Sequence, residues 1–452
     1  MVLAVSGDLG GPGLMGRGEE TEPSPGRRRR ALVAWGLYDF GNSAFTTLIV
    51  TFVYAAWFTR SFAPDEATGT AWWSRAVTLS AVLVALASPV VGALADRSGR
   101  RKPFLLFFTL LSIVATVRLC FVESSAPVLA LVVFGIANVA YEMGCVLYNA
   151  FLPDIAPPGR IGRVSGFGWG LGYLGGILAL LLALFLLIRP DPPLFGLTRD
   201  GGQNVRAVTL LVAAWFAVFA VPLFLWVPDA RRRGAPAAPG AVRAAFRQLG
   251  ATFREIRRYR QVVRFLIARL VYNDGLITIF AFGGIYASGT FGFSTEKLIW
   301  FGILLNVTAA AGAFVLGFLD DRLGGKRTIL LTLGALVLAT TGALLARDGT
   351  LFWIFGALLG IFVGPNQSAS RSLMGRFVPP DLENEFFGFF AFSGKASAFL
   401  GPLLLGIVTE ASGSQRVGLS VVLLFFVVGG VILWGVDEQE GEAAGGRATS
   451  AD

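Results

Sequence analysis

The chain has 452 residues, of which 54% are hydrophobic and 15% are charged. Soluble domains carry about 25% charged residues, so this composition excludes disorder, a collagen-like fibre and most soluble enzymes. The net charge of +9 fits either nucleic-acid binding or cytoplasmic loops of a membrane protein. The chain has no His and two Cys, so we expect no His-dependent catalysis, metal site, disulfide framework or cofactor.

Residues 1–30 are rich in Gly, Pro and charge, and we predict that they form a disordered tail. Apolar stretches of about 20 residues, the length that a helix needs to cross a bilayer, follow this tail. The twelve predicted spans are 32–58, 74–95, 103–122, 127–150, 164–188, 206–227, 262–288, 295–319, 327–346, 350–372, 385–409 and 416–436. A linker at 228–261 ends in an Arg-rich amphipathic segment suited to a membrane surface. Residues 437–452 are polar and predict a second disordered tail.

The positions of Lys and Arg predict the orientation of the chain. If the N-terminal tail lies inside, the inside segments carry 25 of the 38 basic residues, the outside loops carry 8 and the spans carry 5. Because loops that stay in the cytoplasm are enriched in Lys and Arg, both termini are predicted to be cytoplasmic. The excess of basic residues is then explained mostly by the orientation of the chain in the membrane, and we expect no nucleic-acid partner.

A repeat relates the two halves of the chain. Residues 92–102 (GALADRSGRRK) and 317–327 (GFLDDRLGGKR) align at an offset of 225, each between the second and third span of its half. The sequence therefore predicts an all-α membrane protein of twelve helices in two pseudo-symmetric six-helix halves, 31–227 and 262–436. The repeat aligns or contains Gly92, Asp96, Arg97, Gly99, Arg100 and Arg101 in the first copy, and Gly317, Asp321, Arg322, Gly324 and Lys326 in the second.

The repeated loop has a physical interpretation as a gate. Gly92 would let two helices approach closely, and the basic cluster could pair with Asp96 and with the C-terminus of a neighbouring helix. Such a latch would stabilise one access state and break in the other. The alternative is that these charges only set the topology. Gly325 replaces the first basic residue in the second copy, so we expect a weaker latch there.

The loop G-x-x-x-D-R-x-G-R-R-K resembles the signature loop of the major facilitator superfamily, and both copies lie where that family places them. The resemblance covers about residues 31–436. It implies a binding site between the halves near the membrane midplane, and transport by rocking of the halves.

A finer resemblance is carried by WGLYDFGNSAF, LYNAFLPDIA, SGFGWGLGYLGG, YNDGLITIFAFGGIYASGTFGFS and GPNQSASRS, which begin at residues 35, 147, 165, 272 and 364. These segments resemble the bacterial UMF1 group, which is related to the fungal vacuole effluxer family. The fungal relatives are associated with amino-acid efflux from the vacuole. For this chain we expect the inner membrane of a bacterium, and the sequence does not name its substrate.

Polar side chains inside the spans indicate a binding site, because a charge at the centre of a spanning helix costs about 2.5–3.5 kcal/mol without a partner or a wet cavity. They concentrate on the first, fourth, seventh and tenth spans, which line the cavity in the superfamily. The candidates for substrate binding or coupling are Asp39, Asn42, Asn138, Tyr141, Glu142, Asn149, Arg269, Tyr272, Asn273, Asp274, Asn366, Gln367, Arg371 and Lys395.

Three acidic and three basic side chains lie deep in the spans, so the buried charge balances. One interpretation is three structural ion pairs, with Asp39 structural or part of the gate. The other assigns Glu142, Arg371 and Lys395 to substrate binding or coupling, and a zwitterion such as an amino acid then fits. Since the chain has no His, Glu142 or Asp274 would carry a coupling proton. Na+ is the other candidate for the coupling ion.

These features predict a monomeric secondary transporter that moves a small solute by alternating access, with membrane lipid as its surroundings. The alternatives are a transporter of a lipid or lysolipid, or a channel or membrane sensor that transports nothing. We expect no enzyme, since no nucleophile–base pair, metal motif or phosphate-binding loop is present.

Overall fold

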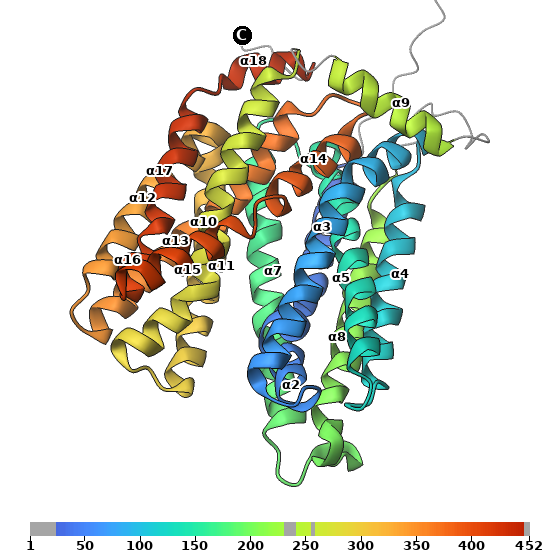
Figure 1. Cartoon of the computed structure of the whole chain (residues 1–452). Helices are drawn as coiled ribbons and strands as arrows, with labels where there is room; N and C mark the ends of the chain where they lie inside the picture. The colour runs from blue at the N-terminus through green and yellow to red at the C-terminus, as the bar shows by residue number, and fades with distance from the viewer. Residues whose placement is uncertain (1–23, 230–240, 255–257, 447–452) are drawn as a thin grey trace, which may run out of the picture.

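The structure, a computed structural model, describes residues 24–229, 241–254 and 258–446. The predictions for most of the first tail, for part of the linker and for the last six residues lie outside the described residues. Within those ranges the chain forms helices and no strand. Figure 1 shows two groups of helices side by side, the N-terminal half in blue to green and the C-terminal half in yellow to red.

The helices of the N-terminal half follow the predicted apolar stretches. They are α1 (Pro25–Ala44), the π-helix η1 (Phe45–Phe52), α2 (Tyr54–Ser61), α3 (Glu66–Ser98), α4 (Arg101–Cys120), α5 (Pro127–Asn149), α6 (Leu152–Ile155), α7 (Ile161–Ala183), the π-helix η2 (Leu184–Ile188) and α8 (Gln203–Trp226). Two single 3-10 turns, η3 (Leu194–Gly196) and η4 (Asp200–Gly202), precede α8. Local sequence sets the ends of α3: the Asp65 carboxylate accepts a hydrogen bond from the Thr68 amide at 2.9 Å, and Gly99, with φ 63°, ends the helix.

The C-terminal half repeats this arrangement. Its helices are α10 (Arg260–Phe291), α11 (Thr295–Leu323), α12 (Gly325–Leu345), α13 (Gly349–Phe377), α14 (Glu383–Lys395), α15 (Leu400–Ser412), α16 (Gln415–Leu419) and α17 (Val421–Trp434). Two further helices, α9 (Ala241–Arg254) from the linker and α18 (Glu438–Ala444) after the last span, lie at the same end of the bundle (Figure 1). We call this the α9 end.

Among the described residues, 11 helical segments are long and apolar enough to cross a membrane. The remaining predicted span, 32–58, corresponds to α1, η1 and α2, where the π-helix and a bend at Val53 interrupt the α-helix. The eleventh predicted span is also broken, between the end of α14 and the start of α15. The outer faces expose apolar side chains such as Leu86, Leu338 and Trp434, as a lipid-facing surface does.

The predicted tails are shorter in the structure. α1 begins at Pro25 and α18 occupies residues 438–444, so the predicted disorder of 25–30 and 437–446 is wrong. The polar composition of the last segment misled the prediction, because α18 is stabilised by contacts with α13 and α10 rather than by an apolar face of its own. These contacts include ion pairs from Arg376 to Glu438 at 3.2 Å and from Arg260 to Glu440 at 2.6 Å.

Candidate functional site

The first copy of the repeated loop holds α3 of the N-terminal half against α14 of the C-terminal half. The Asp96 carboxylate accepts hydrogen bonds from the backbone amides of Asn384 and Glu385, at 3.1 and 2.8 Å, and from the Asn384 side chain at 2.6 Å. It therefore caps the first turn of α14, where free amides carry partial positive charge. A Cβ on Gly92 would lie 2.8 Å from the Glu385 Cα, so this close approach requires glycine. We call this contact interlock A.

Arg101 adds an ion pair beside interlock A. Its guanidinium contacts Asp154 of its own half at 2.6 Å and Glu383 of the other half at 3.0 Å, and it donates to the Ala150 carbonyl at 2.8 Å. Arg101 is 5% exposed and Glu383 is fully buried. Because carboxylates face the guanidinium from both halves, the cost of burying its charge is offset.

The second copy of the loop makes the equivalent contact with the halves exchanged. The Asp321 carboxylate of α11 accepts hydrogen bonds from the amides of Gly162 and Arg163, at 2.7 and 3.3 Å, in the first turn of α7. It also forms an ion pair with the Arg163 guanidinium at 2.5 Å. A Cβ on Gly317 would lie 3.3 Å from the Arg163 Cα, so α7 and α11 are also in close contact. We call this contact interlock B.

Two acidic residues cap the helices that follow the repeated loops. The Asp229 carboxylate, after the sixth span, accepts hydrogen bonds from the amides of Arg101 and Lys102 at the start of α4. The Glu438 carboxylate, after the twelfth span, accepts hydrogen bonds from the amides of Gly325 and Lys326 at the start of α12. The segments that follow the two halves therefore cap equivalent helices, a relation that the sequence repeat did not reveal.

The basic cluster was predicted to pair with Asp96, but the hydrogen bonds of the Asp96 carboxylate come from the N-terminus of a helix of the other half, where free amides are donors. The predicted contact of the cluster with a helix C-terminus is present, since Arg101 donates to the Ala150 carbonyl at the end of α5. The predicted weakness of the second latch also has no basis in these contacts. Arg100, which Gly325 replaces, is exposed, whereas Asp321 has an ion pair with Arg163.

The other residues of the repeated loop have simpler surroundings. Arg97 and Arg322 are exposed, which agrees with the interpretation that they set the topology. Gly99 and Gly324 have positive φ, 63° and 87°, where each loop leaves the preceding helix. Lys326 takes part through its backbone amide.

A cavity of about 460 Å³ lies between the halves, lined by α1, η1, α5, α7, α10, α11, α13 and α14. The lining includes Thr51 of η1 and Asn306 in the first half of α11, so the cavity extends toward the end opposite α9. Nine predicted site residues line it: Asp39, Tyr141, Glu142, Asn149, Arg269, Asn273, Gln367, Arg371 and Lys395.

Arg371 of α13 reaches from the C-terminal half into the N-terminal half. Its guanidinium forms an ion pair with Asp39 at 3.1 Å and donates to the Asn149 side chain at 3.2 Å. It also donates to the hydroxyl and the carbonyl of Ser165, at 3.0 and 2.7 Å, and lies over the ring of Trp35 at 4.8 Å. With the Arg371 side chain 4% exposed, these contacts enclose the charge almost completely.

The second ion pair across the cavity joins Lys395 of α14 to Glu142 of α5 at 2.6 Å. Their side chains are 31% and 18% exposed, so this pair is more open to the cavity than the pair of Arg371 with Asp39. No other hydrogen bond of the Lys395 amine is seen within the described part of the chain.

The seventh span carries a third group of polar residues beside the break in the eleventh span. Arg269 donates to the Phe390 carbonyl and the Ser393 hydroxyl, at 2.8 and 2.9 Å. The Asp274 carboxylate accepts a hydrogen bond from the Gly401 amide at 2.8 Å and so caps α15. The break therefore leaves a helix N-terminus inside the membrane, and a carboxylate satisfies it.

Five predicted site residues do not line the cavity: Asn42, Asn138, Tyr272, Asp274 and Asn366. Tyr272 and Asn366 instead bond within their own half, to Ser370 and Thr332. The helical period places a residue on a face but does not say which neighbour that face meets.

The sequence did not single out several residues that matter to this geometry: Ser165, Arg163, Asp154, Asp229, Arg376, Glu383, Asn384, Glu385 and Glu438. Most of them lie at the ends of helices, where acidic and basic residues are ordinary. The signal that was available is position, since several stand within a few residues of a predicted span boundary.

This geometry defines a class of protein: a transporter of the major facilitator superfamily, with two six-helix halves around a central cavity. Solved structures with this fold include the proton:xylose symporter XylE bound to 6-bromo-6-deoxy-D-glucose, with a TM-score of 0.70, 12% identity and coverage of 94% of this chain and 98% of that one. The human organic anion transporter MFSD10 (TETRAN) has a TM-score of 0.70 at 17% identity, covering 91% of this chain and 100% of that one. FucP in the outward conformation has a TM-score of 0.69 at 14% identity, covering 91% and 98%.

The chain belongs to the family described as "Vacuole effluxer Atg22 like", whose model matches residues 66–446. A relative in Bacillus subtilis (strain 168), "Uncharacterized MFS-type transporter YxiO", is 28% identical over 409 residues, covering 90% of this chain and 94% of its own length. Autophagy-related protein 22 of Coccidioides immitis (strain RS) is 24% identical over 446 residues, covering 82% of this chain and 72% of its own. The predicted superfamily, the resemblance to the vacuole effluxer family and the fold are confirmed, and the chain is an integral membrane transporter rather than an enzyme.

Proposed function

We propose that this transporter moves a small zwitterionic solute, such as an amino acid, by alternating access. The observation that carries the proposal is the ion pair of Lys395 with Glu142 across the central cavity. A zwitterion offers the same two charges, so its carboxylate can replace Glu142 on Lys395 while its ammonium group replaces Lys395 on Glu142. The two partly buried charges then keep partners throughout the exchange.

Arg371 and Asp39 suit a different role. The Arg371 guanidinium already has four hydrogen bonds to Asp39, Asn149 and Ser165 as well as an aromatic ring beside it, which leaves little room for a substrate group. In this proposal the Arg371–Asp39 pair is a structural part of the cavity wall, and the substrate binds at Lys395 and Glu142. A lipid substrate is less favoured, because the cavity walls carry Asp39, Glu142 and Arg269 as well as Lys395.

We place the α9 end in the cytoplasm. The inside segments defined by the sequence, which carry 25 of the 38 basic residues, include the loops and helices of this end. With both interlocks formed and the cavity extending away from α9, the described conformation is then the outward-facing one. Transport requires the substrate to weaken the interlocks so that the opposite, inward-facing state becomes populated.

A proton on Glu142 would couple transport to a gradient. Protonation removes the negative charge that faces Lys395, and so weakens a contact that joins the halves. Each charge moved across 100 mV carries about 2.3 kcal/mol, enough to bias accumulation by tens of fold. Asp274 is less suited to this role, because it lies outside the cavity lining and caps α15.

Exchange in proteoliposomes tests the proposed substrate class. Vesicles loaded with unlabelled amino acids should take up labelled amino acids, and Lys395→Met should raise KM by about 10- to 100-fold, the loss of a charge-assisted hydrogen bond. Glu410→Gln, an exposed acid on α15, should leave exchange unchanged. Exchange of sugars but not amino acids, or a Lys395→Met variant with unchanged KM, would refute the proposal.

The coupling role needs a separate measurement. Glu142→Gln should still exchange substrate at equal pH, with a raised KM because the ammonium group loses its carboxylate partner, and should lose accumulation driven by a pH gradient. If the pair is only structural, the variant should instead yield less folded protein, with gradient-driven accumulation per folded molecule unchanged.

A further inference from the structure

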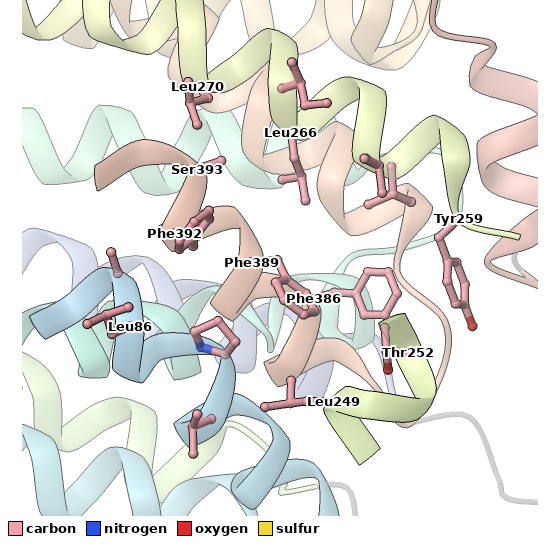
Figure 2. A pocket seen from close by; sticks show the side chains of 16 residues that line it. Leu86, Leu249, Thr252, Tyr259, Leu266, Leu270, Phe386, Phe389, Phe392 and Ser393 are labelled. Atoms are coloured by element: carbon pink, nitrogen blue, oxygen red, sulfur yellow. The ribbon is translucent and has the colours of Figure 1, made fainter. Parts of the chain in front are cut away.

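A second cavity, of about 450 Å³, lies on the flank of the bundle at the α9 end and shares no lining residue with the central cavity. Its walls come from α3, α9, α10 and α14, so both halves and the linker contribute (Figure 2). Apart from Thr252, Tyr259 and Ser393, every side chain that lines it is apolar. It therefore suits an apolar occupant.

The mouth of this cavity faces the bilayer. Leu86 of α3 and Ile267 of α10, which line it, are 67% and 50% exposed on the outer surface of the bundle. Figure 2 shows Leu86, Leu266 and Phe392 turned toward the same space from three different helices. The apolar groups that surround such a mouth are the acyl chains of lipids.

Helix α9 supplies the matching charge above the cavity. Its Leu249 is buried against Ala93 of α3 and Phe389 of α14, whereas Arg247 and Arg254 are exposed, as is Arg258 just after the helix. Residues 241–254 contain three Arg and no acidic residue. An amphipathic helix with a basic outer face lies in the plane of the membrane interface and attracts anionic head groups.

The roof of the cavity is bonded to interlock A. The Glu385 carboxylate accepts hydrogen bonds from the Gln248 side chain and the Thr252 hydroxyl of α9, both at 2.6 Å, and the Glu385 amide donates to Asp96. The walls, α3 on one side and α10 and α14 on the other, belong to halves that must separate at this end when interlock A opens. Whatever fills the cavity therefore binds the closed state of interlock A better than the open one.

We propose that this flank cavity binds one acyl chain of an anionic phospholipid of the cytoplasmic leaflet, with its phosphate held by Arg247, Arg254 and Arg258, and that the lipid keeps interlock A closed. The binding stands on the cavity and the charge of α9. The effect on transport rests on the function proposed above.

Lipid retention tests the binding. The purified full chain is exchanged into mixed micelles containing equal amounts of phosphatidylglycerol and phosphatidylcholine, and the lipids retained are counted by native mass spectrometry. We expect one phosphatidylglycerol to be retained in preference to phosphatidylcholine. The triple variant Arg247→Gln, Arg254→Gln, Arg258→Gln should lose this preference by about fivefold or more, since each arginine near an anionic surface contributes to the attraction.

Two further variants separate the cavity from general surface charge. Arg27→Gln, Arg29→Gln, Arg30→Gln removes three exposed charges at the same end and should keep the preference. Leu266→Trp, which fills the cavity, should abolish retention of either lipid, and Ile267→Trp at the mouth gives the same test if Leu266→Trp does not fold. Equal losses in the two arginine triples, or full retention in a folded cavity-filling variant, would overturn the proposal.

The conformational effect has its own readout. Nitroxide labels on the exposed residues Arg160 and Asp381, one in each half at the α9 end, report its opening by double electron–electron resonance. Nanodiscs with 30% phosphatidylglycerol should show a larger closed population than nanodiscs of phosphatidylcholine alone, and Leu266→Trp should remove the difference. Lipid retention without amino-acid exchange would refute the proposed function alone, whereas exchange without selective retention would refute the lipid site alone.

Discussion

At interlock A, Asp96 caps a helix of the other half, and a different side chain, Arg101, makes the neighbouring ion pair between the halves. At interlock B, the Asp321 carboxylate makes both contacts. Within the described residues, Asp96 accepts hydrogen bonds from uncharged donors of α14 alone, and the ion pair across the halves is made by Arg101 and Glu383. Asp321 caps α7 and also pairs with Arg163. Both copies of the repeat therefore hold the two halves together, but the charged groups that do so are distributed differently.

A second difference lies in what supports each interlock. Interlock A is bonded to α9 through Glu385, and interlock B has no equivalent helix from the linker among the described residues. Under the lipid proposal above, interlock A is therefore the one that events at the membrane surface can influence. A shared motif in the sequence does not give the two interlocks the same surroundings.

The largest loss of stability is expected from Arg101→Leu. The change removes the guanidinium that pairs with Glu383 and Asp154, and breaking a buried pair costs about 3–5 kcal/mol. Thermal unfolding of the purified protein measures the loss. The matched control is Lys326→Leu, the equivalent position of the repeat, which makes no ion pair in the part of the chain that the structure describes and should cost far less. Similar losses for the two variants would show that the interlocks are alike after all.

The next largest effect is on the ratio of closed to open molecules at the α9 end, which Asp321→Asn and Asp96→Asn should lower by different amounts. Asp321→Asn loses the charge-assisted contact with Arg163, although the Asn oxygen can still accept from the α7 amides, and it should lower the closed-to-open ratio at the α9 end by about 10- to 100-fold. Asp96→Asn should lower it less, because Arg101 and Glu383 still join the halves. The Arg160 and Asp381 labels measure both ratios once Cys120 and Cys145 are replaced by Ser. A larger opening in Asp96→Asn would mean that the charge of Asp96 matters more to closure than the charge of Asp321.

A smaller effect is expected from the double variant Gln248→Ala, Thr252→Val, which removes the bonds of α9 to Glu385. Each hydrogen bond contributes about 1 kcal/mol net, so the closed-to-open ratio should fall by about 5- to 30-fold. Gly250→Ala is the control on the same helix, because an added Cβ there meets no atom within 4 Å. An unchanged ratio in the double variant would mean that α9 does not support interlock A.

The smallest effect concerns α18, near interlock B. Hydrogen bonds from Arg260 and Gln261 lower the pKa of Glu440 from 4.5 to about 2. Since the folded pKa lies below the unfolded one, the contribution to stability is present above about pH 4.5 and is lost as the pH falls toward 2. Glu440→Gln should therefore show a smaller drop in melting temperature between pH 7 and pH 3 than the wild type. The same drop in both proteins would contradict the assignment, and Glu410→Gln is the exposed control.

The sequence predicted the helical spans and the two repeated aspartates because both depend on local composition or on internal similarity. It did not predict the partners of Asp96 and Asp321, since backbone amides of α14 and α7 make those contacts and an amide has no sequence signature. The pairing of Lys395 with Glu142 was open for a related reason. Periodicity placed Glu142 on a polar face and left Lys395 as a single charge in its span, and only the packing of α5 on α14 brings them together. The break after Lys395 falls in the small and apolar segment 396–399, which reads as a continuous span.

Interlock A has a consequence for the way the protein is made. Asn384 follows Asp96 by 288 residues, an interval of about 15–60 s at ordinary rates of synthesis. Arg101 is not left unpaired in that time, because Asp154 follows it by only 53 residues. Interlock B, whose carboxylate reaches back to an α7 already in the membrane, forms once α11 is inserted. Asp96 must wait for α14, so the growing chain closes interlock B first and interlock A last.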